Sequence, residues 1–426
     1  MNVIILFGML IILLSLSVPI GIALGLATVV TMMLTSDIPL IMISQNAFAA
    51  LDSFPLMAIP FFMLAGALMG YGGISKRLLA LADSMVGFIT GGLAMVTTMA
   101  CMFFAAISGS GPATVSAIGS FMIPSMKERD YAEGFAAAIT AAAGSIGVII
   151  PPSIPFVIYG VVSGASVGEM FLAGIIPGII IGLALMLVSY VISRKKGYVG
   201  GDEKPSAKRF FMALKDSIWA LLVPGIILGG IYGGIFTPTE AAVVAVVYAL
   251  IIGKFVYKEL DFKKMYASFK EAALINGATT FMIGLSMSFA SYLTMDQIPA
   301  KIANSLIMLT DNRFVILILI NLFLLVVGCF VDNISSMIIL TPIFLPVVVK
   351  YGIDPVHFGL FMTVALATGF VTPPYGANLF VASAISGVKM EVISKYMVPF
   401  MLALIFCLFL FTFVPSLSML LPQLLR

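Results

Sequence analysis

Two strings of small polar residues interrupt apolar sequence in this 426-residue chain, and each precedes a second break that carries paired prolines. The first set is Ser108–Thr114 with Ser145–Ser153, and the second is Asp332–Ser336 with Thr368–Tyr375. Hydroxyl, amide and carbonyl oxygens bind Na⁺ where transporter helices unwind. The helix N-termini that follow each break favour an anionic solute, such as a carboxylate. The residue types therefore predict a site for a cation and an anion.

The expected cation ligands are oxygens of the two strings and of the two breaks that follow them. They belong to Ser108, Ser110, Ser145, Gly147, Val148, Ile150, Asn333, Ser335, Thr368, Gly369 and Thr372. The residues expected to contact the solute are Gly111, Thr114, Ser153, Asp332, Ser336, Tyr375 and Asn378. Na⁺ is favoured over protons, because a proton path needs titratable groups and the first string has none. Na⁺ is the only metal expected, and no organic cofactor is predicted.

Asp332 is the exception among these neutral groups. It lies between Gly328–Val331 and Ile334–Leu340, deep in apolar sequence, where an ionisable residue is usually functional. Two roles stay open: a cation or solute ligand, or a structural bond to exposed amides. If the coupling ion were a proton, Asp332 would be its carrier.

The two strings belong to an internal repeat. Residues 108–179, shifted forward by 222 positions without a gap, bring prolines and glycines into register. The coincident positions include Pro124 and Pro346, Gly147 and Gly369, Pro151-Pro152 and Pro373-Pro374, and Pro177 and Pro399. Because these residues interrupt helices, the repeat predicts the same broken segments twice. In a transporter, paired broken segments in two repeats mark the binding site.

Composition sets the class. Hydrophobic residues make up 61% of the chain and charged residues 10%, which excludes a water-soluble globule and predicts an all-α polytopic protein in a lipid bilayer. Nothing supports nucleic-acid binding. Cys101, Cys329 and Cys407 lie in apolar runs without metal-ligand spacing, so we expect them to be buried.

The elements that position the site can be placed from hydropathy and breaks. Re-entrant helical hairpins are expected at 91–124 and 315–349, and discontinuous helices at 131–163 and 355–386. Interfacial arms are expected at 74–88 and 298–310. The apolar run 3–35, interrupted at Pro19, allows one kinked helix or two short ones. Further spans are expected at 54–71, 171–192, 218–236, 241–257, 272–294 and 392–421.

These elements divide the chain into five parts. Residues 91–164 and 313–387 each hold one hairpin and one discontinuous helix, while 1–90, 165–312 and 388–426 supply the surrounding helices and arms. With the loop 194–215 placed in the cytoplasm, 18 of the 22 basic residues fall on that side. This positive-inside bias makes the first hairpin enter from the cytoplasm and the second from outside. The repeats are therefore predicted to have inverted topology, as alternating access requires.

The motifs resemble the large membrane subunit (DctM-type) of tripartite ATP-independent periplasmic (TRAP) transporters along nearly the whole chain. They are Pro19–Gly25, Ser108–Thr114, Ile150–Ser153 and Val371–Tyr375. The order of hairpin and broken helix also resembles the divalent-anion/sodium symporters, whose Ser-Asn-Thr tips differ from those here, so residue roles transfer only by position.

The TRAP resemblance implies an elevator-type transport domain that moves against a scaffold in the bacterial inner membrane. It also implies Na⁺ symport, a small DctQ-type membrane subunit on a separate polypeptide and a periplasmic substrate-binding protein. The solute would be an organic acid, such as sialic acid or a C4-dicarboxylate, with a weak preference for an acidic sugar.

A different kind of transporter, a channel or an enzyme would each require different sequence features. An H⁺-coupled organic anion transporter, or one that works without a binding protein, is the main alternative. A channel would conduct without saturation, whereas two opposed hairpins favour an occluded site. An intramembrane hydrolase needs a nucleophile with a base or a metal set, and the chain has no His-Glu-x-x-His motif. We therefore expect a transporter and no enzymatic activity.

Overall fold

The computed structural model describes residues 2–36, 38–201, 206–302, 310–373 and 376–425, which are helical and contain no strand. Seven helices in these ranges are long and apolar enough to cross a bilayer, which agrees with a multi-pass membrane protein. They are 54–71, α10 (Val167–Lys196), α11 (Ala207–Tyr232), 238–256, α13 (Phe262–Met295), α16 (Asn333–Lys350) and α19 (Met390–Phe413).

The N-terminal apolar run forms two helices, α1 (Asn2–Ser15) and α2 (Ile20–Thr35). Pro19 is the N-cap of α2, and Ser17 just before it has a φ of 60°. Proline lacks the amide that would continue the first helix, which settles the choice left open by the sequence. A further helix, α3 (Ile41–Leu51), lies before Asp52, between the apolar run 3–35 and the span expected from residue 54, where the sequence interpretation placed no helix.

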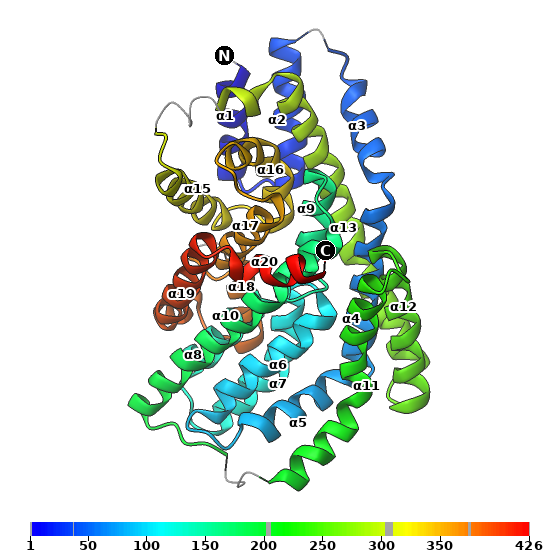
Figure 1. Ribbon diagram of the computed structural model, residues 1–426, viewed down its shortest axis with the longest axis vertical. Helices are drawn as coiled ribbons and strands as arrows, with labels where there is room; N and C mark the ends of the chain where they lie inside the picture. The colour runs from blue at the N-terminus through cyan, green and yellow to red at the C-terminus, as the bar shows by residue number, and fades with distance from the viewer. Residues whose placement is uncertain (1, 37, 202–205, 303–309, 374–375, 426) are drawn as a thin grey trace.

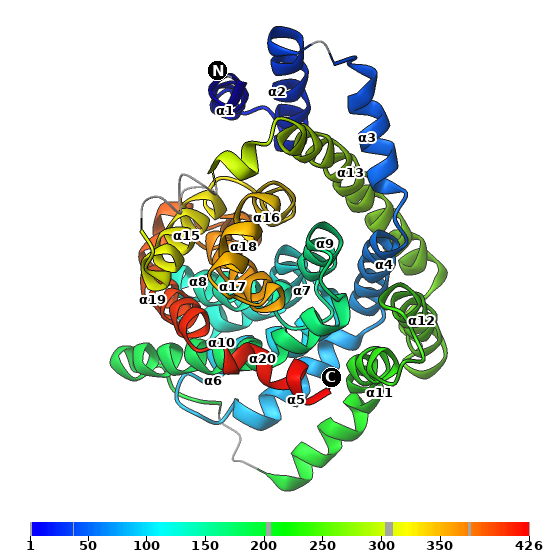
Figure 2. The same ribbon diagram turned by 45° about the horizontal axis from the view of Figure 1, so that its top comes forward.

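One layer of the molecule is built on α13, the longest helix. It packs on α2, α3 and α4 (Ala58–Tyr71), and α4 packs on α12 (Pro238–Ile251), which in turn contacts α11 (Figures 1 and 2). Two predicted spans begin too late. α11 and α13 both start about three turns earlier, with polar residues on their first turns. The segment up to Lys215 was expected to be a polar loop and is helical from Ala207.

The broken segments lie together in a second body (Figure 2). Its helices are α6 (Gly92–Ser108), α7 (Gly111–Glu128), α8 (Glu133–Gly144), α9 (Ile154–Ser163), α15 (Arg313–Gly328), α16, α17 (Pro355–Gly369) and α18 (Ala377–Ser386). The helical breaks at the tips are shorter than predicted. Only residues 109–110 separate α6 from α7, and 329–332 separate α15 from α16. Thr114 and Ser335 therefore belong to the first turns of helices, where short polar side chains are well tolerated.

The two repeats interlock in this body. α9 of the first repeat packs on α16 of the second, while α18 of the second packs on α7 of the first. Within each repeat, the helix before the tip packs on the first half of the broken helix: α6 packs on α8, and α15 packs on α17. Corresponding helices of the two repeats thus make corresponding contacts, so the repeat in the sequence is also a repeat in the packing.

α10 and α19 pack on this body as well. α10 contacts α6, α8, α9 and α17, and α19 contacts α8 and α17. The sequence interpretation grouped both with the surrounding scaffold, and in the structure both pack on the body that holds the broken segments. The final predicted span also divides: α19 ends at Phe413, and Pro415 precedes a separate helix, α20 (Ser416–Leu425), that lies against α10.

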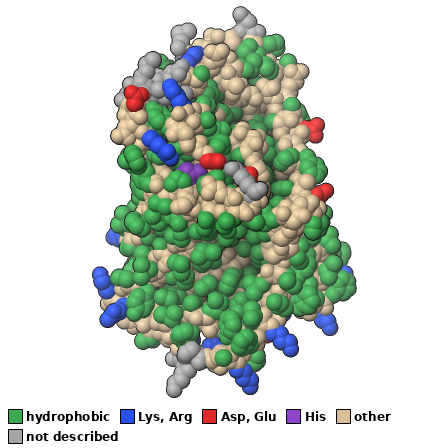
Figure 3. Space-filling model, in the orientation of Figure 1, with side chains coloured by type: hydrophobic (Ala, Val, Ile, Leu, Met, Phe, Trp, Pro, Cys, Tyr) green, Lys and Arg blue, Asp and Glu red, His purple; other side chains and the backbone are tan. Residues whose placement is uncertain are grey.

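The first predicted arm is α5 (Ile74–Val86), an amphipathic helix between α6 and α11. Ser217 on α11 donates a hydrogen bond to the Arg77 carbonyl (2.8 Å), and Arg209 pairs with Asp83. Of the second predicted arm, 298–302 are helical and 303–309 lie outside the described residues. Figure 3 shows Lys and Arg side chains gathered at the lower end of the molecule, the end where α5 and the start of α11 lie in Figure 1.

Candidate functional site

The first tip, between α6 and α7, is bonded directly to the broken helix of its own repeat. Gly109 has a φ of +63°, a conformation that favours glycine. Its carbonyl accepts a hydrogen bond from the Ile154 amide at 3.2 Å, across the break between α8 and α9. Thr114 donates to the Ser110 carbonyl (2.8 Å), and its hydroxyl lies 2.9 Å from that of Ser108. The tip is thus a small, fixed cluster of oxygens.

Gly147 brings the broken helix against this cluster. A Cβ built at this glycine would lie 2.5 Å from Thr114 Oγ1 and 2.6 Å from the Ser110 carbonyl oxygen. The Ser145 hydroxyl donates to the Ala142 carbonyl at 2.6 Å, which leaves the oxygen lone pairs available to a cation. Ser153 donates to the Val148 carbonyl (2.6 Å) and caps α9 by accepting from the Phe156 amide. Residues expected to bind the cation and residues expected to bind the solute therefore lie in one buried cluster.

The second tip carries an unusual number of polar atoms without partners. Asp332 caps α16 by accepting a hydrogen bond from the Ser335 amide at its Oδ1 (2.9 Å). Its Oδ2, both amide atoms of Asn333 and the Ser336 hydroxyl are buried and have no hydrogen-bond partner in the described part of the chain. Buried polar atoms are nearly always satisfied. Three of these atoms are oxygens within about one helical turn, and such oxygens are ligands that Na⁺ accepts.

The second broken helix offers hydroxyls that are already bonded to the backbone. Thr368 donates to the Val364 carbonyl and Thr372 to the Thr368 carbonyl, both at 2.8 Å. Gly369 packs directly on Gly328, at the end of α15. Tyr375, which was expected to contact the solute, lies outside the described residues.

The two repeats meet at Asn378. Its Nδ2 donates to the Ala141 carbonyl on α8 at 3.1 Å, and its buried Oδ1 has no partner among the described residues. A Cβ built at Gly111 would lie 3.1 Å from that Oδ1 and 3.2 Å from the Phe370 ring. The structure thus joins Gly111 at the first tip to Asn378 after the second break, two positions that the sequence assigned to the solute.

A cavity of about 390 Å³ separates the first tip from α4 and α13. Ser108 and Ser110 line it together with residues that the sequence interpretation missed: Tyr71, Ser75, Ser116, Ser120 and Glu271. Ser116 and Ser120 are one turn apart on α7, a spacing that could have indicated a polar face. The candidate solute residues that are described do not line this cavity.

The two tips have different surroundings. Asn333, Ser335 and Ser336 are at most 2% exposed, whereas Ser110 is half-buried and Ser116 exposed beside the cavity. The Ser286 hydroxyl on α13 donates to that of Ser335 at 3.3 Å, so the second tip contacts the outer layer directly. The first tip therefore borders a cavity through Ser110, whereas the second tip contacts α13 through Ser335.

Cysteine labelling would test this asymmetry. In a background without Cys101, Cys329 and Cys407, we expect Ser116→Cys to react readily with a maleimide and Ser336→Cys to react only after denaturation, since thiol reactivity requires access. The measurement is the labelled fraction over time for purified protein in detergent. Equal labelling of the two positions would contradict the described exposure.

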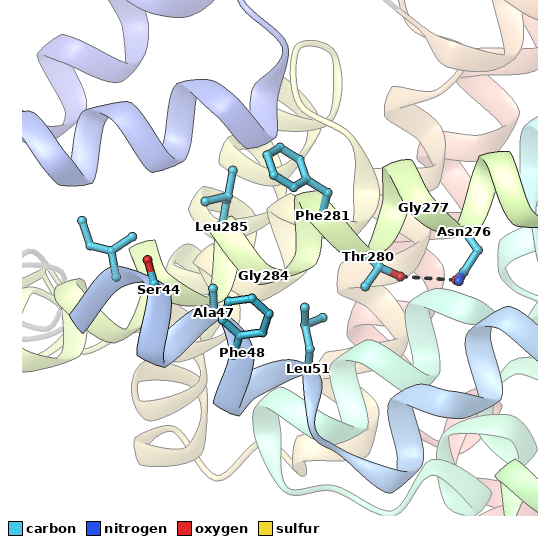
Figure 4. A pocket seen from close by; sticks show the side chains of 11 residues that line it. Ser44, Ala47, Phe48, Leu51, Asn276, Gly277, Thr280, Phe281, Gly284 and Leu285 are labelled. Atoms are coloured by element: carbon cyan, nitrogen blue, oxygen red, sulfur yellow. Dashed lines mark hydrogen bonds between the residues drawn. The ribbon is translucent and has the colours of Figure 1, made fainter. Parts of the chain in front are cut away.

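A second cavity, of about 540 Å³, lies between α3 and α13 on the outer layer (Figure 4). Its wall is mainly apolar, including Ala47, Leu51 and Leu285, with a hydrogen bond from Thr280 to Asn276 at 3.4 Å. None of the residues that line it belongs to the predicted site. The breaks and the 390 Å³ cavity beside the first tip are therefore the candidate functional site.

Comparison with known proteins adds independent information. Residues 7–417 match the family model described as "Tripartite ATP-independent periplasmic transporter, DctM component". The chain is similar to the isethionate TRAP transporter permease protein DctMQ of Oleidesulfovibrio alaskensis, at 50% identity over 97% of this chain. It spans 65% of the length of that relative.

Two further relatives match over most of both chains. The C4-dicarboxylate TRAP transporter large permease protein DctM of Pseudomonas aeruginosa is 39% identical over 94% of each chain. The sialic acid TRAP transporter large permease protein SiaM of Vibrio cholerae is 38% identical over 95% of each.

A solved structure shares the fold. The YdaH transporter of Alcanivorax borkumensis superposes with a TM-score of 0.63 at 15% identity, covering 87% of this chain and 86% of that one. The family match and the relatives confirm the resemblance drawn from the motifs and exclude the enzyme class. The chain belongs to the DctM family of tripartite ATP-independent periplasmic transporters and is a large permease subunit.

Proposed function

We propose that this permease imports a small organic anion together with Na⁺. The observation that carries the proposal is the set of unpartnered buried atoms at the second tip, on Asp332, Asn333 and Ser336. A Na⁺ ion would supply the missing partner for the three oxygens. The first tip and the break at Ser145–Val148 would hold a further cation through hydroxyl and carbonyl oxygens.

The solute class follows from helix ends and from the relatives. α7, α9, α16 and α18 all begin at the breaks, and their N-termini direct positive dipole ends toward them. The relatives are named for isethionate, C4-dicarboxylate and sialic acid, which share a negative charge on a carboxylate or sulfonate. We therefore propose an anion of this class. The isethionate relative broadens the solute beyond the acidic sugar favoured by the sequence.

The movement proposed is an elevator step. The body with the two interlocked repeats, together with α10 and α19, would move against the layer formed by α2, α3, α4, α11, α12 and α13. In this reading α6–α7 and α15–α16 are re-entrant hairpins of inverted topology in the bacterial inner membrane. A cavity beside the first tip and a contact between the second tip and α13 would correspond to one end of that movement.

The proposed partners are a small DctQ-type membrane subunit and a periplasmic substrate-binding protein. The tripartite family description and the double name of the DctMQ relative support this proposal. The small subunit would widen the layer against which the moving body slides.

Uptake into liposomes tests the coupling ion. The permease would be reconstituted with its small subunit and binding protein, and solute uptake measured with an inward Na⁺ gradient, an inward H⁺ gradient or neither. We expect uptake to need Na⁺ and to fall roughly tenfold or more in Ser108→Ala and Ser335→Ala, because each loses a ligand oxygen.

Ser125→Ala is the matched control, since Ser125 is partly exposed on α7 and bonds only its own helix. This variant should keep wild-type uptake. Uptake driven by H⁺ without Na⁺ would contradict the proposal and make Asp332 the proton carrier to test.

A further inference from the structure

A third cavity, of about 620 Å³, lies away from the breaks, where the arm α5 meets α11 and the segment that follows α12. Its wall carries both charged and aromatic side chains. They are Lys76, Arg77, Lys215, Asp216, Trp219, Tyr257 and Glu259. The proposed transport cycle uses none of these residues.

Arg77 and Glu259 already satisfy each other. The Arg77 guanidinium contacts Glu259 Oε1 and the Gly73 carbonyl, both at 2.8 Å, and lies 3.7 Å above the centre of the Tyr257 ring. Lys76 and Lys215, by contrast, are exposed and form no salt bridge with any described residue. The cavity therefore presents two ammonium groups that have no carboxylate partner.

Asp216 is the remaining charged group in the wall. It too forms no salt bridge with the described residues, although its carbonyl accepts a hydrogen bond from the Tyr257 hydroxyl at 3.2 Å. The two lysines and this aspartate together leave one net positive charge. A ligand with a single negative charge and additional hydroxyl donors would match all three groups.

The position of the cavity indicates where such a ligand comes from. Trp219, the only tryptophan of the chain, is 42% exposed, as is typical of side chains at a membrane–water interface. The apolar residues Ile218 and Leu222, on either side of it in α11, are about 40% exposed, and α11 is long and apolar enough to span a bilayer. The basic-residue distribution assigns this end to the cytoplasm.

We propose that this cavity binds the headgroup of a monoanionic phospholipid, with phosphatidylglycerol as the matching chemistry. The phosphodiester contacts Lys76 and Lys215, the glycerol hydroxyls donate to Asp216, and the acyl chains follow the exposed apolar face of α11. Basic pockets between membrane helices at the cytoplasmic surface bind anionic headgroups in this way. The lipid would stabilise the contact between α5 and α11, to which the hydrogen bond of Ser217 and the ion pair of Arg209 already contribute.

A zwitterionic lipid matches less well. Phosphatidylethanolamine would add its own ammonium next to the two lysines and would leave the net positive charge uncompensated. Soluble phosphate could contact the lysines but would leave the apolar face of α11 uncovered.

Native mass spectrometry of the purified, delipidated permease would test the site. Phosphatidylglycerol, phosphatidylethanolamine, phosphatidylcholine and inorganic phosphate would be titrated separately, and the bound fraction measured for each. We expect the phosphatidylglycerol affinity to fall by about tenfold in Lys76→Gln/Lys215→Gln, because both ammonium contacts to the phosphodiester are lost.

The matched control is Lys195→Gln/Lys196→Gln. These lysines lie in the last turn of α10 at the same basic end but outside the cavity, so this variant should bind phosphatidylglycerol like the wild type. Equal loss in both double variants, or none in either, would overturn the proposal. So would equal binding of phosphatidylethanolamine, or binding of inorganic phosphate that phosphatidylglycerol cannot displace.

Discussion

Replacement of Gly147 by alanine is expected to lower Na⁺-coupled solute uptake strongly, although the substitution adds only one methyl group. The added Cβ would lie 2.5 Å from Thr114 Oγ1 and 2.6 Å from the Ser110 carbonyl oxygen. Both distances are far below van der Waals contact, so the broken helix would have to move away from the first tip. The displacement separates oxygens that are proposed to share a cation, and uptake should fall by roughly tenfold or more.

Gly229→Ala is the control for this substitution. Gly229 lies in α11, and a Cβ built there meets nothing within 4 Å. Alanine is a better helix former than glycine, so this variant should retain both its fold and its uptake. The measurement is liposome uptake, with thermal unfolding in detergent to establish that Gly147→Ala is folded. Normal uptake in a folded Gly147→Ala protein would rule out a cation site at this contact.

The second large effect is expected at Asp332. Asparagine there keeps a carbonyl oxygen to accept the Ser335 amide and so keeps the cap of α16. It removes the charge, however, and with it the partner that a cation would find in the unpaired Oδ2. Asp332→Asn should therefore lower uptake by roughly tenfold or more and weaken its dependence on Na⁺, with little change in the unfolding temperature.

Asp261→Asn is the control that distinguishes the loss of a helix cap from the loss of a cation ligand. Asp261 caps α13 through the Lys264 amide at 2.7 Å, in an exposed position. The two substitutions are chemically identical, and only the one at the second tip should impair uptake. If Asp332→Asn transports like the wild type, Asp332 is a structural cap, the second of the two roles left open by its sequence.

The positions of the breaks could be predicted from the sequence because their cause is local. Pro151-Pro152 interrupts its helix through missing amides, and the matching offset in the second half exposes the repeat. The lengths of the breaks could not be predicted in the same way. Ser110 and Asp332 serve as N-caps, so that the residues after them join a helix although their composition is typical of a loop.

Contacts between segments that lie far apart in the sequence could not be predicted from it. Nothing local places Glu271 of α13 in the same cavity as Ser110, or Ser286 against Ser335, because these pairs depend on how the two layers meet. The packing of α10 and α19 on the body with the broken segments was missed for the same reason. An apolar span has the same composition whether it faces a scaffold or a moving body, and only packing distinguishes the two.

The interlocking of the repeats has a consequence for biosynthesis. The Asn378 side chain bonds the Ala141 carbonyl across 237 residues, and α18 covers α7. When the ribosome has completed α9, the face of α7 that α18 will cover has no partner, and it stays uncovered in the bilayer until the last quarter of the chain is inserted. Contacts of such long sequence separation form slowly. The newly made first half is therefore the stage at which this permease is most exposed to membrane proteases and quality control.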